Sequence, residues 1–244
     1  MRRIFADLHL CADLKNFQHV SRMVHKASML GYRMVAVPLS TGFSEKELQP
    51  LRSVCSEANV DMALRVDLKP KTPKELLQDL RRLRRRFEIV AVSCNSKSVA
   101  RQAAKDRRVD LLSFPSLDFR ERFFDASEAE LASNSLAFLE VDMKPLLVLE
   151  GPVKVRLLSS LRREVAIAKK ADVPVVISSG VSDVMLLRKP REMAALALLF
   201  DLDEASSLRA VSENPLAIIK RNREKLGAGF VAPGIRVIRR GRDC

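Results

Sequence analysis

The chain is poor in the residues that mark several common protein classes. It contains no tryptophan, one tyrosine, three histidines and four cysteines in 244 residues, and the cysteines form no Cys-x-x-Cys pair. Such widely spread cysteines argue against both a disulfide framework and a structural zinc site, so we expect reduced thiols. No apolar run approaches the roughly 20 residues that cross a bilayer. Without tryptophan anchors, a helix lying on a membrane surface is a poor alternative.

Several catalytic sequence motifs are also absent. The chain has no Gly-x-x-x-x-Gly-Lys-Ser/Thr phosphate loop, no Gly-x-Gly-x-x-Gly motif and no Gly-x-Ser-x-Gly nucleophile elbow. Ser179-Gly180 has no histidine near it in the sequence, so we expect a turn there. Met1-Arg2-Arg3 leads directly into a strand-like segment without the apolar stretch of a signal peptide, which predicts a cytoplasmic protein.

Positive charge, by contrast, is abundant. Lysine and arginine total 43 against 30 acidic residues, which gives a formal net charge of +13, and the isoelectric point is about 10.0. Such an imbalance says nothing about the fold but indicates a polyanionic partner. Apolar residues make up 47% of the chain, which is enough for a sizeable core.

Strand-like and helix-like segments alternate along the chain, which is typical of repeated βα units. The expected strands are Ile4–Leu10, Met34–Leu39, Asp61–Leu68, Glu88–Ser93, Asp110–Phe114, Leu136–Met143 and Val173–Ser178. We therefore predict a TIM-like (β/α) barrel with about seven parallel strands. An open doubly wound sheet is the alternative, because periodicity does not separate the two. Residues 1–226 form the expected barrel domain, and residues 227–244 form a basic tail that we expect to be flexible.

The helices between these strands have recognisable ends. Ser44 with Glu47, and Thr72-Pro73 with Glu75, are predicted to be capping boxes. Asn214-Pro215 repeats the pattern of a cap followed by proline. Gly31 and Gly227 stand where helix C-caps are expected.

Polar side chains alternate along three of the predicted strands, so their shared faces can be deduced. Asp7, His9 and Cys11 share one face, Arg65 and Asp67 a second, and Glu140 and Asp142 a third. In parallel α/β barrels the chemistry lies at the carboxyl ends of the strands. These side chains are therefore the candidates for a site.

This layout resembles the polymerase-and-histidinol-phosphatase (PHP) barrels, which are metal-dependent phosphoesterases with a seven-stranded barrel. Their first strand ends in His-x-His, where this chain has His9-Leu10-Cys11. Ser113-Phe114-Pro115 replaces a histidine before proline, and Ser182-Asp183-Val184-Met185 has methionine at a histidine position.

The missing histidines decide between a metal enzyme and another function. Besides His9 only His19 and His25 remain, both on the first expected helix, and one imidazole does not build a multinuclear site. We predict no catalytic residues and no bound metal. A charge network of Asp7, Arg65, Asp67 and Glu140 is expected in place of the metals. A weak magnesium site made of carboxylates, and with it a PHP-type phosphoesterase acting on its own, is the alternative.

Nearly the whole chain resembles a branch of this superfamily that lacks the metal site, protein component 3 of archaeal ribonuclease P, homologous to the thirty-kilodalton subunit of the eukaryotic enzyme. The resemblance rests on these segments, in this order: Ala6–Leu10, Arg108–Ser113, Val175–Gly180, Arg188–Glu192 and Val211–Pro215. It implies a subunit that helps a catalytic RNA remove the 5′ leader of precursor tRNA, an endonucleolytic hydrolysis. The implied partners are the ribonuclease P RNA, component 2, other holoenzyme proteins and precursor tRNA. The protein itself needs no cofactor, and the RNA uses Mg²⁺.

Basic residues are the candidates for contact with that RNA. Arg188 and Lys189 lie inside one of the resembling segments, and Lys97 and Arg101 share one face of a helix. Lys220, Arg221 and Arg223 begin a stretch that has eight cations and two acids from Pro215 to the end of the sequence. These side chains are expected to bind phosphates, which gives affinity without sequence readout.

Overall fold

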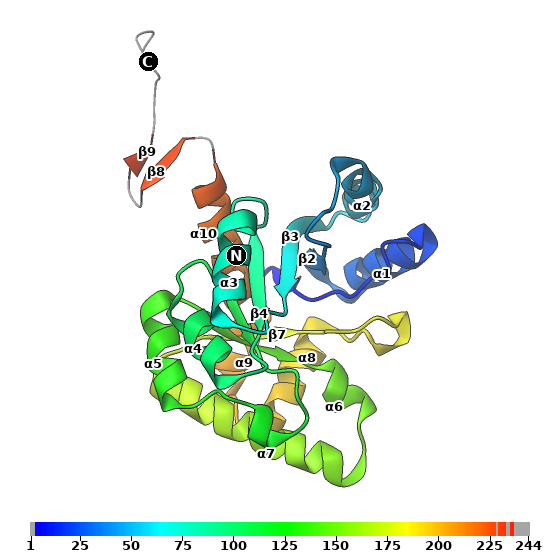
Figure 1. Ribbon diagram of the computed structural model, residues 1–244. Coiled ribbons are helices and arrows are strands. Elements are labelled where there is room, and N and C mark those ends of the chain that lie inside the picture. Colours follow the sequence, from blue (N-terminus) through cyan, green and yellow to red (C-terminus); the bar gives the residue numbers. More distant parts are fainter. Residues whose placement is uncertain (1–2, 228, 233–234, 237–244) are drawn as a thin grey trace, which may run out of the picture.

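The computed structural model describes residues 3–227, 229–232 and 235–236, and it has the predicted barrel architecture (Figure 1). Seven parallel strands pair in the sequential order β1 to β7. A doubly wound sheet would reverse its strand order from a central strand outwards, so the sequential order excludes that alternative. The strands are β1 (Phe5–Asp7), β2 (Tyr32–Pro38), β3 (Asp61–Leu68), β4 (Ile89–Ser93), β5 (Leu111–Ser113), β6 (Phe138–Asp142) and β7 (Val175–Ser178).

Helices follow the strands and surround them (Figure 1). The α-helices are α1 (Phe17–Leu30), α2 (Glu45–Glu57), α3 (Pro73–Leu83), α4 (Lys97–Lys105), α5 (Ala126–Ser135), α6 (Lys144–Val148), α7 (Gly151–Lys170), α8 (Pro190–Leu196), α9 (Glu204–Ala210) and α10 (Glu213–Leu226). Short 3₁₀ turns are η1 (Phe119–Glu121), η2 (Val184–Leu186) and η3 (Ala197–Phe200).

Most of the predicted helix ends are found, and two differ. Ser44 and Glu47 form the expected capping box, and Gly31 ends α1 with a left-handed φ of 103°. Thr72 does cap α3, but Glu75 bonds the backbone N–H of Lys71, so this cap is not a reciprocal box. Asn214 lies inside α10 and donates its amide to the Val175 carbonyl at 2.7 Å, so the prediction of a cap at Asn214 was wrong.

The interior has two apolar layers. The larger one lies between the strands and the surrounding helices. A smaller one fills the barrel itself and combines alanines such as Ala6, Ala36 and Ala63 with larger side chains such as Leu8 and Phe138. Ile218 and Ile219 of α10 pack into this inner layer. Helix α10 contacts β1, β4 and β7, so it covers the end of the barrel at which the strands begin.

The barrel closes between β7 and β1 without a regular ladder in the described part of the chain. Just past the strand ends, the Gly180 N–H donates to the His9 carbonyl and the Cys11 N–H donates to the Val181 carbonyl, both at 3.0 Å. At the other end of β1, the Ala6 N–H donates to the carbonyl of Val211, between α9 and α10. Loops and helices therefore complete the ring that seven strands leave open.

The predicted basic tail is only partly described. Within it, β8 (Phe230–Ala232) pairs with β9 (Ile235–Arg236) in an antiparallel hairpin. The arginines at 239, 240 and 242 lie outside the described residues. The flexibility expected of the tail therefore stays a prediction. Cys11, Cys55 and Cys94 carry free thiols. None of the helices in the described ranges is both long and apolar enough to span a membrane.

Candidate functional site

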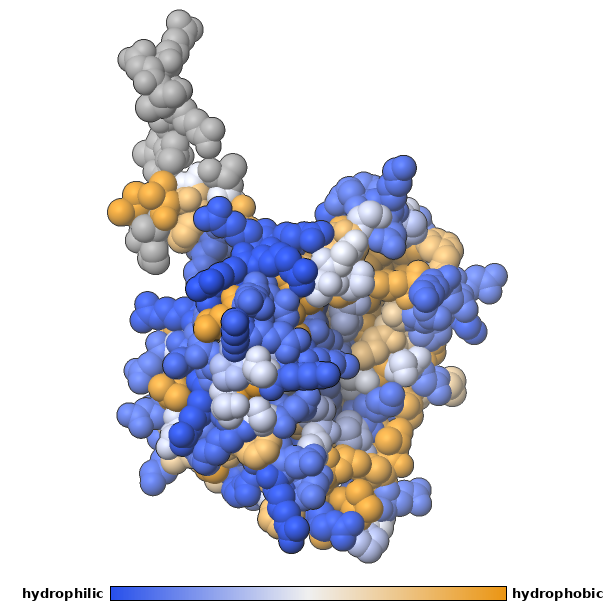
Figure 2. Space-filling view, in the orientation of Figure 1, coloured by the Kyte–Doolittle hydropathy of each residue, from blue (hydrophilic) through white to orange (hydrophobic). Residues whose placement is uncertain are grey.

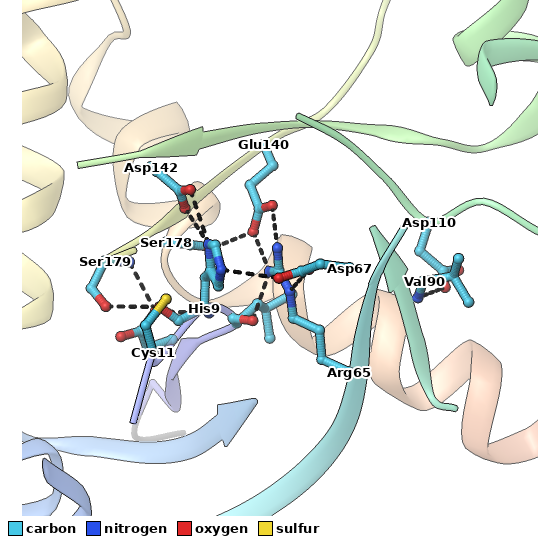
Figure 3. A network of polar contacts seen from close by, with 12 residues as sticks. His9, Cys11, Arg65, Asp67, Val90, Asp110, Glu140, Asp142, Ser178 and Ser179 are labelled. Carbon is cyan, nitrogen blue, oxygen red and sulfur yellow. Dashed lines mark hydrogen bonds and ion pairs between the residues drawn. The ribbon is translucent and has the colours of Figure 1, made fainter. Parts of the chain in front are cut away.

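Arg65 occupies the centre of the barrel mouth at which the strands end (Figure 3). Its guanidinium is buried and donates to both carboxylate oxygens of Glu140, at 2.5 and 2.7 Å. It also donates to Asp67 at 2.7 Å and to the carbonyl of Leu8 at 2.7 Å. Burial disfavours its charge, but Glu140 and Asp67 outweigh burial and raise the pKa of Arg65. A fixed cation thus joins β3 and β6 to the residue that follows β1.

His9 adds a second cation to this network. Its Nδ1 lies 2.9 Å from Asp142, and its Nε2 lies 3.2 Å from Asp67. Burial and the nearby Arg65 lower the pKa of His9, but the two carboxylates outweigh them, and the pKa is well above its usual value. Burial raises the pKa of Asp67, whereas Arg65 and His9 together hold it well below its usual range. His9 is therefore an imidazolium bridge between β3 and β6 at neutral pH.

Asp7, which we expected in the same network, is not among the hydrogen-bond partners that Arg65 has in the described residues. Its Oδ1 accepts from the backbone N–H groups of Ser179 at 2.9 Å and His9 at 3.1 Å. Ser179 in turn donates its hydroxyl to the His9 carbonyl at 3.2 Å. The carboxylate of Asp7 therefore links the segment that follows β7 to β1, where the barrel closes. The structure brings together Arg65, Asp67 and Glu140 of the predicted set, and leaves Asp7 beside them.

The donor set at this mouth does not fit a divalent metal. One ligand atom each from His9, Glu140 and Asp142 lies within 4.8 Å of the others, a spacing that suits a metal. However, both oxygens of Glu140 are engaged by Arg65, and Ser178 donates to one of them at 2.7 Å. Both ring nitrogens of His9 face carboxylates, so a metal would have to displace a proton that they hold, since a metal ligand must be deprotonated. Arg65 and His9 therefore already bind the carboxylate oxygens that a metal would need as ligands.

A cavity of about 520 Å³ lies over this network. Cys11 and Asp142 line it together with Ser93, Ser113 and Lys69. Gly180 is required beside it because its φ is +63°, and a Cβ there would lie 2.8 Å from Cγ of Asp142. Where we expected a turn at Ser179-Gly180, the backbone passes close to the side chain of Asp142 in the site.

Four of the predicted RNA-contact residues lie on helices and loops outside this mouth. Lys97 pairs with Asp125 at 2.9 Å, and Arg101 pairs with the buried Glu128 at 3.0 Å. Arg188 donates to the carbonyl groups of Met185 and Leu187, at 2.7 and 3.1 Å. Lys189 is exposed and lines a cavity of about 390 Å³ that is rich in cations. Those cations are Arg3, Arg33, Lys189 and Arg191.

The other three predicted RNA-contact residues lie on α10, at the opposite end of the barrel. Lys220 is exposed. Arg221 donates to Asp110 at 2.9 Å, and the side chain of Arg223 holds Asp61 and Glu88. Contact with RNA remains a prediction for all seven residues.

The charge network predicted from the sequence did not include every member that the structure shows. His9 and Asp142 belong with Arg65, and the alternation that placed Asp7 with His9 and Glu140 with Asp142 was the signal for them. Arg122 and Glu164 form another buried pair, with two bonds of 2.6 Å, and Arg122 also donates to the carbonyls of Phe114 and Ser116. No sequence pattern links that pair, because its members are 42 residues apart.

Comparison with known proteins gives a consistent family. The family described as RNase P subunit p30 matches residues 4–226. The ribonuclease P protein component 3 of Methanosarcina barkeri is 32% identical over 234 residues, which cover 96% of this chain and 95% of that protein. The component 3 of Methanothermobacter thermautotrophicus is 24% identical over 239 residues, covering 96% and 95%.

Solved structures with the same fold include enzymes and a ribonucleoprotein subunit. A chain in the cryo-EM structure of archaeal ribonuclease P with mature tRNA has a TM-score of 0.82 at 21% identity, covering 97% of this chain and 99% of that chain. An amidohydrolase from an environmental sample of the Sargasso Sea has a TM-score of 0.60 at 10% identity, covering 91% and 66%. At such identities the likeness shows the barrel fold alone.

Proposed function

This chain belongs to the family of the RNase P subunit p30, and we propose from that premise that it assists the catalytic RNA of an archaeal ribonuclease P. It is a protein subunit of ribonuclease P and serves tRNA processing within a ribonucleoprotein. In the proposed reaction, the holoenzyme removes the 5′ leader of precursor tRNA by endonucleolytic hydrolysis. The RNA carries the catalytic Mg²⁺, and the protein lowers the Mg²⁺ concentration that the RNA needs.

The chemistry of the barrel mouth is the observation that supports a non-catalytic role for the protein. In an enzyme of this fold, the carboxyl ends of the strands present the reacting groups. Here the corresponding side chains bind one another. Arg65 forms an ion pair with Glu140, and His9 forms ion pairs with Asp67 and Asp142. A carboxylate that is already bound in this way is a poor general base or metal ligand. We therefore expect the isolated chain to be inactive.

The partners follow from the family and from the charge. The net charge of +13 suits a polyanion, and phosphate contacts from lysine and arginine provide affinity that depends on salt. We propose the ribonuclease P RNA, component 2 and other holoenzyme proteins, and precursor tRNA as partners. A cytoplasmic location goes with this function.

The test is cleavage of precursor tRNA by the RNA and component 2 of the same organism, titrated with Mg²⁺ with and without this chain. We expect cleavage at markedly lower Mg²⁺ only when the chain is present, and no cleavage by the chain alone. Phosphate-ester hydrolysis by the chain alone would contradict the proposal, provided that it persists at constant specific activity through purification and is lost on Glu140→Gln substitution. The protein would then be a phosphoesterase.

A further inference from the structure

A basic cluster lies at the end of the barrel opposite the mouth described above. We define the α10 cluster as Arg84, Arg107, Arg221 and Lys225. Arg84 ends α3, Arg107 lies in the turn between α4 and β5, and Arg221 and Lys225 are four residues apart on α10, on one face of the helix. All of these segments lead to the beginnings of strands or cover them. In Figure 2, strongly hydrophilic side chains gather where α3 and the end of α10 lie.

Asp110 is the carboxylate around which two members of the cluster are arranged. Its Oδ2 accepts from Arg84 and from the backbone N–H of Val90, both at 2.9 Å. Its Oδ1 accepts from Arg221 at 2.9 Å and from Asn222 at 2.7 Å. Each oxygen therefore already has two donors, and Asp110 is buried. This carboxylate fixes the positions of Arg84 and Arg221 but has no free acceptor for the rest of the cluster.

The neighbouring carboxylates are occupied as well. Asp106 is bound by Arg108 through two bonds of 2.9 and 2.7 Å, and Asp61 and Glu88 are held by Arg223. Arg107 and Lys225 are exposed, and neither forms an ion pair with a carboxylate within the described ranges. Two cations therefore remain available to an outside anion.

The crowding of like charges has an energetic consequence. Burial and then Arg221 lower the pKa of Lys225, and Arg84 and Arg107 add to this, while Asp110 partly opposes it. The repulsion between these positive charges is relieved when an anion binds between them. A phosphate group suits the arrangement, since guanidinium groups bind phosphate oxygens with strong, charge-assisted hydrogen bonds.

We propose that the α10 cluster binds backbone phosphates of the ribonuclease P RNA, so that the RNA lies against the end of the barrel covered by α10. The inference rests on the proposed function and names the surface that carries it. The 18 residues that follow α10 in the sequence contain four further arginines. At the barrel mouth, by contrast, Arg65 and His9 are already neutralised by carboxylates.

The experiment compares two charge-matched double variants of the full chain in complex with component 2. Arg107→Gln with Lys225→Gln removes the two unpaired cations of the cluster. Lys46→Gln with Arg156→Gln removes two exposed cations that form no ion pair within the described residues. Lys46 lies in the first turn of α2 and Arg156 in the second turn of α7. Helix α2 follows the end of β2, and α7 follows β6 and α6, so both positions lie towards the opposite end of the barrel. Thermal melting of each variant checks that the fold is retained.

Affinity for the ribonuclease P RNA, transcribed in vitro, is measured at salt concentrations from roughly 50 to 200 mM. Each lost phosphate contact reduces the slope of log affinity against log salt by about 0.7 to 0.9. We expect the cluster variant to lose about 1.4 to 1.8 from the slope, and the control variant to keep the wild-type slope.

Equal slopes for the two variants overturn the inference, because the cluster would then be one part of a diffuse positive field. Wild-type protein that lowers the Mg²⁺ requirement while the cluster variant binds RNA unchanged overturns the inference and leaves the proposed function in place. Wild-type protein that neither binds the RNA nor changes its cleavage overturns both.

Discussion

Replacing Arg65 with methionine should destabilise the protein more than any exposed charge change. Methionine fills a similar volume but leaves Glu140 buried without its partner, and Asp67 and the Leu8 carbonyl each lose a donor. The side chains of Arg65 and Glu140 are 1% and 0% exposed, so solvent does not screen the pair. Removal of one partner of such a pair typically costs about 3–5 kcal/mol.

That cost is large beside the stability of a whole domain, which is about 5–15 kcal/mol. At about 2–4 °C per kcal/mol for a chain of this size, the melting temperature should fall by roughly 6–20 °C. Urea unfolding followed by circular dichroism measures the free energy of unfolding directly. Arg156→Met, at an exposed position, is the control and should stay within about 0.5 kcal/mol of wild type.

A double variant separates the ion pair from simple loss of packing. Glu140→Gln in the Arg65→Met background removes the stranded charge and keeps an acceptor for the Ser178 hydroxyl. We expect the double variant to be at least about 2 kcal/mol more stable than the sum of the single effects predicts. Effects that add within about 0.5 kcal/mol would refute the reasoning, because residues that interact do not show additive effects.

Three further predictions concern the same mouth. Because the pKa of His9 is raised in the folded state, its bridge stabilises fully below the unfolded pKa of about 6.5, and that contribution is lost as pH rises through the folded pKa. The unfolding free energy of wild type should therefore fall with rising pH above about 6.5 relative to His9→Gln, and parallel curves would contradict the bridge. Gly180→Ala should lower the melting temperature because of its φ of +63° and its contact with Asp142, whereas Gly42→Ala, with open space around it, should not; equal effects would contradict the close approach. Mass spectrometry after dialysis should find no stoichiometric Zn or Mn, and tightly bound metal would contradict the charge network.

The fold could be predicted from the sequence because its signals are local. The strand at Asp61–Leu68 has the bounds that were expected, and all seven strands appear. The barrel order follows from uninterrupted βα units with right-handed crossovers. The position of α10 could not be predicted, since a helix that covers the end of a barrel has the same one-sided apolar pattern as a helix on its outside. Ile218 and Ile219 face the inside of the barrel only because of the tertiary arrangement.

The site was partly predictable for a related reason. Alternation along a strand places Glu140 and Asp142 on one face, and parallel strands bring that face to the same mouth as Arg65. The alternation of side chains does not show which carboxylate the guanidinium of Arg65 binds. Asp7 bonds across the closure to Ser179, 172 residues away, and that geometry depends on how β7 meets β1. Arg221 likewise binds Asp110 at a separation of 111 residues, which no local pattern reveals.

The two ends of the barrel differ in a way that bears on where a polyanion binds. At the mouth, two cations, Arg65 and His9, face the carboxylates of Asp67, Glu140 and Asp142, and every one of these groups is bound to another. Among these five residues a phosphate would meet no free donor and three carboxylates against two cations, and Lys69 lines the cavity above them. At the end covered by α10, Asp110 and the neighbouring carboxylates are already bound, and two cations of the α10 cluster, Arg107 and Lys225, are exposed without an ion pair in the described residues. Unpaired cations attract a phosphate more strongly than cations already bound to carboxylates, so an approaching phosphate gains more at the second end. A protein whose enzyme-like mouth has its charged groups bound to one another, and whose opposite end has unpaired cations, directs RNA away from the place where other barrels of this fold perform chemistry.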